Sequence, residues 1–104
     1  MPIADIFPHE LRRTVPALRS QEGIPDPIVY IRFFASEWVW YVTEGSPDDD
    51  DAFVFFGFVK GPGKEWGEFS LSELHAFADF GLSIERDVDF KPGRLSQIMS
   101  AGGR

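Results

Sequence analysis

Residues 53–77 read FVFFGFVKGPGKEWGEFSLSELHAF, which combines two apolar runs, a turn and the start of a helix. Phenylalanine and valine favour strands, and the glycines and proline of residues 61–64 favour a tight turn. Residues 53–60 and 65–69 are therefore predicted to pair as an antiparallel hairpin.

The register of this hairpin is predicted from its charges and glycines. Pairing Lys60 with Glu65 places opposite charges across the ladder. The same register lays Phe58 over Gly67, where an aromatic ring would cover bare backbone.

A helix is predicted directly after the hairpin. Ser70 and Glu73 fit a capping box, in which each side chain accepts a hydrogen bond from the other residue's backbone N–H. An apolar stripe continues at helical spacing through Leu71, Leu74, Phe77 and Ala78. Gly81 is a natural C-terminal stop.

A second hairpin is predicted upstream, with strands at residues 28–34 and 38–44 and a three-residue connection at 35–37. Its register would set Arg32 against Trp40 and Phe34 against Trp38. One face would then carry Tyr30, Arg32, Phe34, Trp38 and Trp40. The opposite face is almost wholly apolar and is predicted to be core: Val29, Ile31, Phe33, Val39, Tyr41 and Thr43.

The rest of the chain is predicted to cover both faces of this sheet. Short helices are expected at residues 8–14 and 94–100, and an extended segment at 82–90. The fold class is therefore α+β, a single domain over residues 1–104 with about four antiparallel strands and two or three short helices. Residues 101–104 are expected to fray.

Composition limits the classes of function. The net charge is −7, and residues 20–59 hold eight acidic side chains against one basic one. This distribution predicts a basic protein partner and disfavours nucleic acid and anionic membrane. The chain has no cysteine, no predicted signal peptide and no apolar run long enough for a bilayer, so we expect a cytoplasmic location.

Three groups of residues are candidate partner-binding sites. The first is the aromatic face with Tyr30, Arg32, Trp38 and Trp40, where Arg32 over Trp40 would form a cation–π pair. The second is the acidic loop of Asp48, Asp49, Asp50 and Asp51. The third is the charged triplet of Glu85, Arg86 and Asp87. The simpler interpretations are a covered second core layer, a solvated loop tip and an ion-paired clamp on the C-terminal segment.

No motif indicates catalysis, a metal or a cofactor. The acidic loop lacks the glycine and glutamate of an EF-hand, and His9 and His75 have no second ligand at helical spacing. No nucleophile elbow or phosphate loop is present. A carboxylate site that draws on Glu22, Glu44, Glu85 and Asp87 is the enzymatic alternative.

Several segments together resemble a known family. They are SQEG (20–23), DPIVY (26–30), WVWY (38–41), FFGFV (55–59), EFSLSEL (68–74) and IERD (84–87). In combination they are similar to the bacterial domain of unknown function 2958 family, over about residues 11–92. The resemblance implies no activity and therefore no catalytic residues, and it implies an association with plasmids and other mobile elements.

The leading functional hypothesis is thus a non-enzymatic, protein-binding or accessory domain. A narrower version is an inhibitor, from a mobile element, that binds a host nucleic-acid-binding defence protein through its acidic surface. The alternatives are the carboxylate enzyme and a domain that acts as a homo-oligomer.

Overall fold

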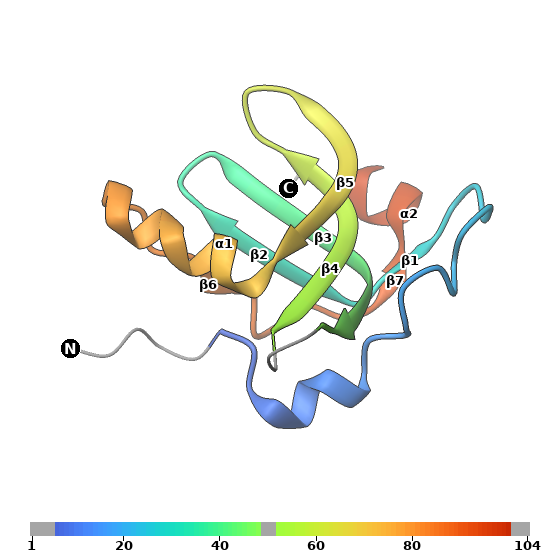
Figure 1. Cartoon of the computed structure of the whole chain (residues 1–104). Helices are drawn as coiled ribbons and strands as arrows, with labels where there is room; N and C mark the ends of the chain where they lie inside the picture. Colours follow the sequence, from blue (N-terminus) through green and yellow to red (C-terminus); the bar gives the residue numbers. More distant parts are fainter. Residues whose placement is uncertain (1–5, 49–51, 101–104) are drawn as a thin grey trace.

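The computed structural model describes residues 6–48 and 52–100 and forms an α+β fold, as predicted (Figure 1). Its main sheet is antiparallel, with five strands instead of four, in the order β5-β4-β3-β2-β6. These strands are β2 (Ile31–Ala35), β3 (Trp38–Pro47), β4 (Phe53–Lys60), β5 (Lys64–Ser70) and β6 (Glu85–Arg86). A separate two-stranded sheet pairs β1 (Ile28–Val29) with β7 (Gly93–Arg94).

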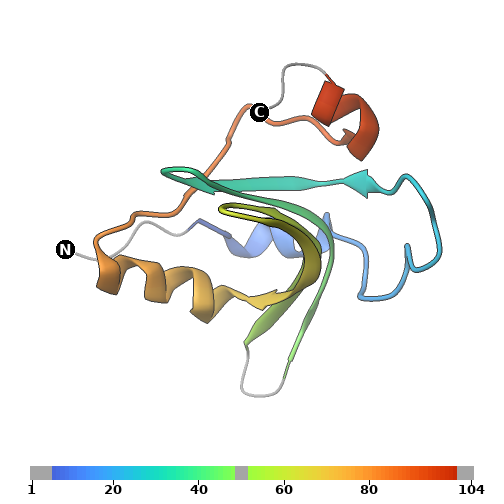
Figure 2. The same ribbon diagram turned by 90° about the horizontal axis from the view of Figure 1, so that it is seen from above.

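Short helices flank the main sheet. They are η1 (His9–Arg13), α1 (Leu71–Ala76), η3 (Phe77–Phe80) and α2 (Leu95–Ser100). Figure 2 shows β2 and β3 between α2 on one side and α1 on the other. No helix of the described residues is long and apolar enough to cross a bilayer.

The predicted helix start is confirmed. Ser70 and Glu73 form the complete capping box, with Glu73 N–H donating to Ser70 Oγ at 3.0 Å and Ser70 N–H donating to Glu73 Oε1 at 2.7 Å. The helical segment ends at Gly81, in the left-handed conformation. This element places Leu74 in the core, where it is almost fully buried.

The core lies between one face of the sheet and the segments that pack on it. Phe33, Phe55 and Phe7 are fully buried there, and the Phe7 ring meets the Phe55 ring edge-on at 5.0 Å. The N-terminal segment supplies three core residues, Ile6, Phe7 and Val15. Hydrophobic burial of this kind is the main favourable term in folding.

The predicted register of the first hairpin is wrong by one residue. Ala35 pairs with Trp38, so the turn contains only Ser36 and Glu37. Phe33 pairs with Trp40, and Arg32 pairs with Tyr41. Because side chains alternate between faces, this slip places Trp38 and Trp40 on the face opposite Arg32.

The second hairpin also differs by one residue. Lys60 pairs with Lys64 instead of Glu65, and Phe58 pairs with Trp66 instead of Gly67. The turn is thus the three residues 61–63. Trp38 packs closely over it, because a Cβ on Gly61 would lie 2.6 Å from the indole.

β3 contains a β-bulge between Val42 and Glu44. A bulge adds one residue to a strand, so the alternation of faces changes beyond it. Glu44 therefore lies on the same face as Phe56, its cross-strand neighbour. Gly57 opposite the bulge must be glycine, since an added Cβ would collide with the carbonyl of Tyr41.

Candidate functional site

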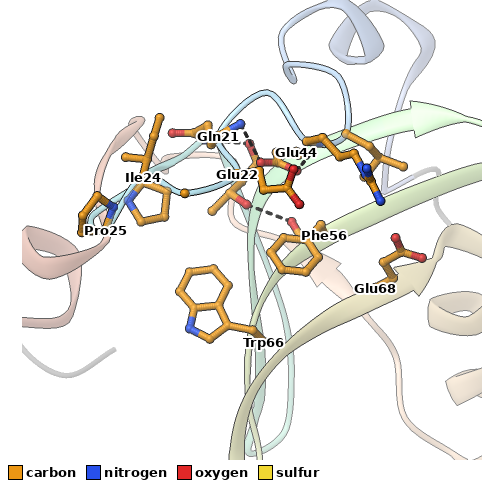
Figure 3. Close-up of a pocket in the computed structure, with 13 residues that line it drawn as sticks. Gln21, Glu22, Ile24, Pro25, Glu44, Phe56, Trp66 and Glu68 are labelled. Atoms are coloured by element: carbon orange, nitrogen blue, oxygen red, sulfur yellow. Dashed lines mark hydrogen bonds between the residues drawn. The ribbon is translucent and has the colours of Figure 1, made fainter.

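A cleft of about 400 Å³ lies between the segment of residues 18–27 and one face of β3, β4 and β5. This is the face that carries Glu44, Phe56 and Trp66. Figure 3 shows Ile24 and Pro25 on one side of this cleft, and Phe56 and Trp66 on the other. Thr43, Glu44 and Glu68 contribute further lining from the strands. The cleft is therefore built from four separate parts of the sequence.

Glu44 holds the wall of the cleft in place. Its carboxylate is only 4% exposed and accepts backbone N–H bonds from Arg19 at 2.7 Å and Gln21 at 2.8 Å. Charge-assisted bonds of this kind are stronger than neutral ones. They hold Arg19 at a positive φ of 76°, which residues other than glycine seldom adopt.

Gln21 adds a second anchor to the same segment. Its amide nitrogen donates to the carbonyls of Ile28 at 2.8 Å and Thr43 at 2.9 Å, and its amide oxygen accepts from the N–H of Ile28 at 2.8 Å. The side chain thus fills the gap between the segment, β1 and the bulge. Because so many polar groups are satisfied, this wall is preorganised before any ligand arrives.

The opposite wall is aromatic. The rings of Phe56 and Trp66 are stacked, with centroids 5.8 Å apart and planes at 16°. Phe58 lies beside the indole at 5.3 Å. Trp66 nevertheless remains 44% exposed, and Ile24 across the cleft is 42% exposed. Such exposed large apolar groups are typical of recognition surfaces.

The charges of the cleft are mainly negative. Three of its four charged residues are acidic: Glu22, Glu44 and Glu68, against Arg19. The Glu44 carboxylate is occupied by the wall, whereas Glu22 and Glu68 are exposed. An aromatic wall beside two exposed carboxylates favours a cation, which the ring face and the carboxylates both attract.

Asp26 joins the far end of the cleft segment to α2. Its carboxylate accepts the Ser96 hydroxyl at 2.6 Å and the Ser96 backbone N–H at 2.9 Å, and Arg94 donates to its carbonyl at 2.9 Å. The bonds from Ser96, with the charge of Arg94, lower the pKa of Asp26 below its ordinary value. The segment is therefore held at both ends, by β3 and by α2.

The predicted aromatic face is not assembled. Trp40 is 3% exposed and stacks on Trp38, and Phe77 meets both indoles edge-on at 5.3 and 5.7 Å. Arg32 contacts Phe34 at 5.0 Å instead of Trp40, so the predicted cation–π pair is wrong. Tyr30 is half-buried against the core cluster.

The charged triplet lies in β6 and just after it, on the sheet edge opposite β5. Arg86 Nε donates to the carbonyl of Ile6 at 3.1 Å, and Asp87 pairs with Arg32 at 3.4 Å. Glu85 is exposed. The enzymatic set is therefore divided, with Glu22 and Glu44 at the cleft and the other two carboxylates at the far edge.

The acidic loop is described only in part. Asp48 is exposed, and its N–H donates to the carbonyl of Ala52 at 2.7 Å. The predictions for Asp49, Asp50 and Asp51, and for the tail at 101–104, lie outside the described residues. Within the described ranges, no three His, Cys, Asp or Glu side chains gather as they would around a metal ion.

Sequence reasoning missed Gln21, Phe56, Trp66 and Glu68 as site residues. Gln21 lies in one of the segments that carry the family resemblance, which is the only signal that could have selected it. The predicted register pairs Phe58 with Gly67, which would place Trp66 on the face opposite Phe58, whereas the structure pairs Phe58 with Trp66 itself. No spacing rule links residues 21, 44 and 66, because the bulge and the hairpin bring them together.

The comparisons with known proteins agree with the resemblance. The family model described as "Protein of unknown function (DUF2958)" matches residues 7–102. Neither the curated proteins nor the solved structures include a match.

Proposed function

This chain belongs to the DUF2958 family, and we propose that it is a protein-binding domain whose cleft receives a positively charged segment of a partner. The observation that carries the proposal is the Trp66 indole, stacked on Phe56 and half-exposed beside Glu22 and Glu68. An indole is the best ring for a cation, and tryptophan is enriched in binding hot spots.

The charge of the whole chain supports the same class of partner. At −7 it attracts a basic segment over a distance of about one Debye length, and the cleft repeats that sign locally. Single-stranded nucleic acid also stacks on sheet aromatics, but it needs a basic groove along its phosphates. The carboxylates beside Trp66 disfavour that ligand.

Two observations weigh against the enzymatic alternative. Both oxygens of Glu44 accept hydrogen bonds from the backbone, so this carboxylate supports the wall and has little freedom to act as a base. Glu85 and Asp87 lie at the opposite sheet edge. A carboxylate reaction in the cleft would therefore depend on Glu22 and Glu68 alone.

The inhibitor hypothesis is a narrower form of the same proposal. A host nucleic-acid-binding protein offers a basic surface, which the cleft and the acidic loop would both attract. Its specific support is the run of four aspartates, together with the association with mobile elements that the family resemblance implies. Only Asp48 of that run is among the described residues.

A binding assay with three labelled peptides tests the proposal. The probes are acetylated octapeptides that alternate serine with arginine, glutamine or glutamate, each with a neutral dye, and fluorescence anisotropy measures their affinity. We expect the arginine peptide to bind, and to bind more weakly as salt is raised. Trp66→Ala should weaken it about tenfold or more.

The matched control is Phe80→Ala, which removes an aromatic side chain that is 82% exposed elsewhere on the surface. It should leave the affinity unchanged. Equal affinity for all three peptides, or an arginine peptide that binds Trp66→Ala as tightly as the parent, would refute a cation site at this cleft.

A further inference from the structure

β5 forms an outer edge of the five-stranded sheet. Within residues 6–48 and 52–100, β4 is the only strand that pairs with it, so its other side has no strand partner. This edge is seven residues long, whereas the opposite edge, β6, has two. Long edges offer a row of backbone donors and acceptors, which natural proteins usually shorten, cover or interrupt with proline.

Of the usual obstructions, the β5 edge has only charged side chains, those of Lys64, Glu65 and Glu68. It contains no proline, and residues 64–66 and Glu68 are exposed. At Gly67 an added Cβ would meet no atom within 4 Å, so the face of β5 opposite Trp66 is open at this residue. Because no strand of the described residues pairs on the outer side of β5, its outward N–H and C=O groups can pair with an added strand.

The edge is continuous with the cleft. Trp66 and Glu68 are two residues apart on β5, so both project to the same face, and both line the cleft. A strand added beside β5 would lie about 4.8 Å away. Every second side chain of that strand would then stand next to Trp66 and Glu68, with Glu22 across the cleft.

We infer that the partner adds an extended segment to β5 and that alternate arginine or lysine side chains of this segment enter the cleft. The inference rests on the proposed function, because it specifies how the cation is delivered. Backbone bonds would supply affinity and the cleft would supply side-chain specificity, as in other cases of strand addition.

The charges of the edge favour such a partner over a second copy of this chain. Glu65 and Glu68 outnumber Lys64 along it, Glu22 lies across the cleft, and each copy carries a net charge of −7. Two copies would therefore repel each other before their edges met. A basic strand meets the opposite sign both along the edge and in the cleft.

Two peptides of equal length and charge test the inference. The first alternates arginine and threonine over eight residues, and the second alternates N-methylarginine and proline. Neither N-methylarginine nor proline has an N–H to donate, so the second peptide cannot pair as a strand on either of its sides. We expect the threonine peptide to bind at least about tenfold more tightly, and Trp66→Ala to weaken it.

Amide hydrogen exchange with the threonine peptide bound supplies an independent readout. Backbone amides on the outer side of β5 should exchange about tenfold more slowly, at alternate positions of residues 64–68. Phe80→Ala should show the same protection, because that residue lies outside the edge.

The possible outcomes distinguish the cation site from the strand addition. If the two peptides bind equally well through Trp66 and β5 gains no protection, strand addition is refuted while the cation site stands. If neither peptide binds, both proposals are refuted. If the outward-facing amides of β5 are already protected without peptide and sedimentation shows a dimer, the occupant of the edge is a second copy and the inference is wrong.

Discussion

Two stacked aromatic pairs lie on opposite faces of the same sheet. Trp38 and Trp40 have ring centroids 5.7 Å apart with planes at 15°, and Phe56 and Trp66 have 5.8 Å and 16°. Phe77 covers the first pair, where Trp40 is 3% exposed, whereas Trp66 of the second pair is 44% exposed. Ring geometry is thus shared, and cover alone separates the buried pair from the exposed one.

Different elements determine why one aromatic pair is covered and the other is exposed. The capping box at Ser70 starts α1 directly after β5, and the helical turn that follows brings Phe77 over the two indoles. On the other face the anchors at Glu44 and Gln21 hold residues 18–27 across a gap from Trp66, and the cleft is that gap. One face is closed by packing, and the other is held open by hydrogen bonds.

Removing the buried indole of the covered pair should have the largest effect on stability. Trp40→Ala is expected to lower the free energy of unfolding by about 3–5 kcal/mol, because a large buried side chain leaves a cavity. Urea denaturation followed by circular dichroism measures it. A loss below about 1 kcal/mol would contradict the burial of this indole.

Loosening the wall of the cleft should have an intermediate effect. In Glu44→Gln the amide nitrogen faces one of the two backbone N–H donors, so a buried donor loses its acceptor at a cost of about 1–3 kcal/mol. Hydrogen exchange should rise in residues 18–23. Glu68→Gln, the same change at an exposed carboxylate, is the control and should change stability by about 0.5 kcal/mol or less.

Removing the exposed indole should change stability little. Trp66→Ala is expected to cost about 1 kcal/mol or less, since much of the ring already contacts solvent. The sharper readout is acrylamide quenching, where Trp66→Phe should remove most of the quenchable tryptophan fluorescence. Trp40→Phe should leave that fraction unchanged, and the reverse result would exchange the roles of the two pairs.

The smallest expected effect is an acid-dependent release of α2. The pKa of Asp26 is lower in the folded chain than in the unfolded one, so its bonds to Ser96 stabilise the fold above the unfolded-state pKa and are lost as pH falls through the folded-state pKa. The amide resonance of Ser96 should titrate at a lower pH than an unfolded peptide of residues 22–30 does at its Asp26. Asp26→Asn should abolish the titration, and a midpoint at or above that of the peptide would contradict the bonds to Ser96.

Local signals in the sequence predicted the elements well. The strand at residues 53–60, the capping box and the C-terminal helix are all present, because each depends on neighbouring residues. β6 lies within residues 82–90, which were expected to be extended, but its place in the main sheet was not predicted. Its pairing with β2 depends on contacts some fifty positions away.

The register of the hairpins and the residues that form the cleft could not be predicted from local sequence signals. Both faces of the first hairpin are apolar, so alternation did not select a register. Its two-residue turn places Ser36 at a positive φ of 54°, without the Asn-Gly sequence that usually marks such turns. The bulge at Thr43 also has no signature, and it determines that Glu44 reaches the cleft.

The two anchors of the cleft segment have a consequence for how such a domain can change its partner. Gln21 fastens one side and Asp26 the other, while Glu22 to Pro25 between them are exposed. Gly23 has a positive φ of 83° that favours glycine, whereas Glu22, Ile24 and Pro25 can change without disturbing the anchors. Under the proposed function, the specificity of the cleft can therefore diversify at these exposed positions while the sheet and its anchors stay constant.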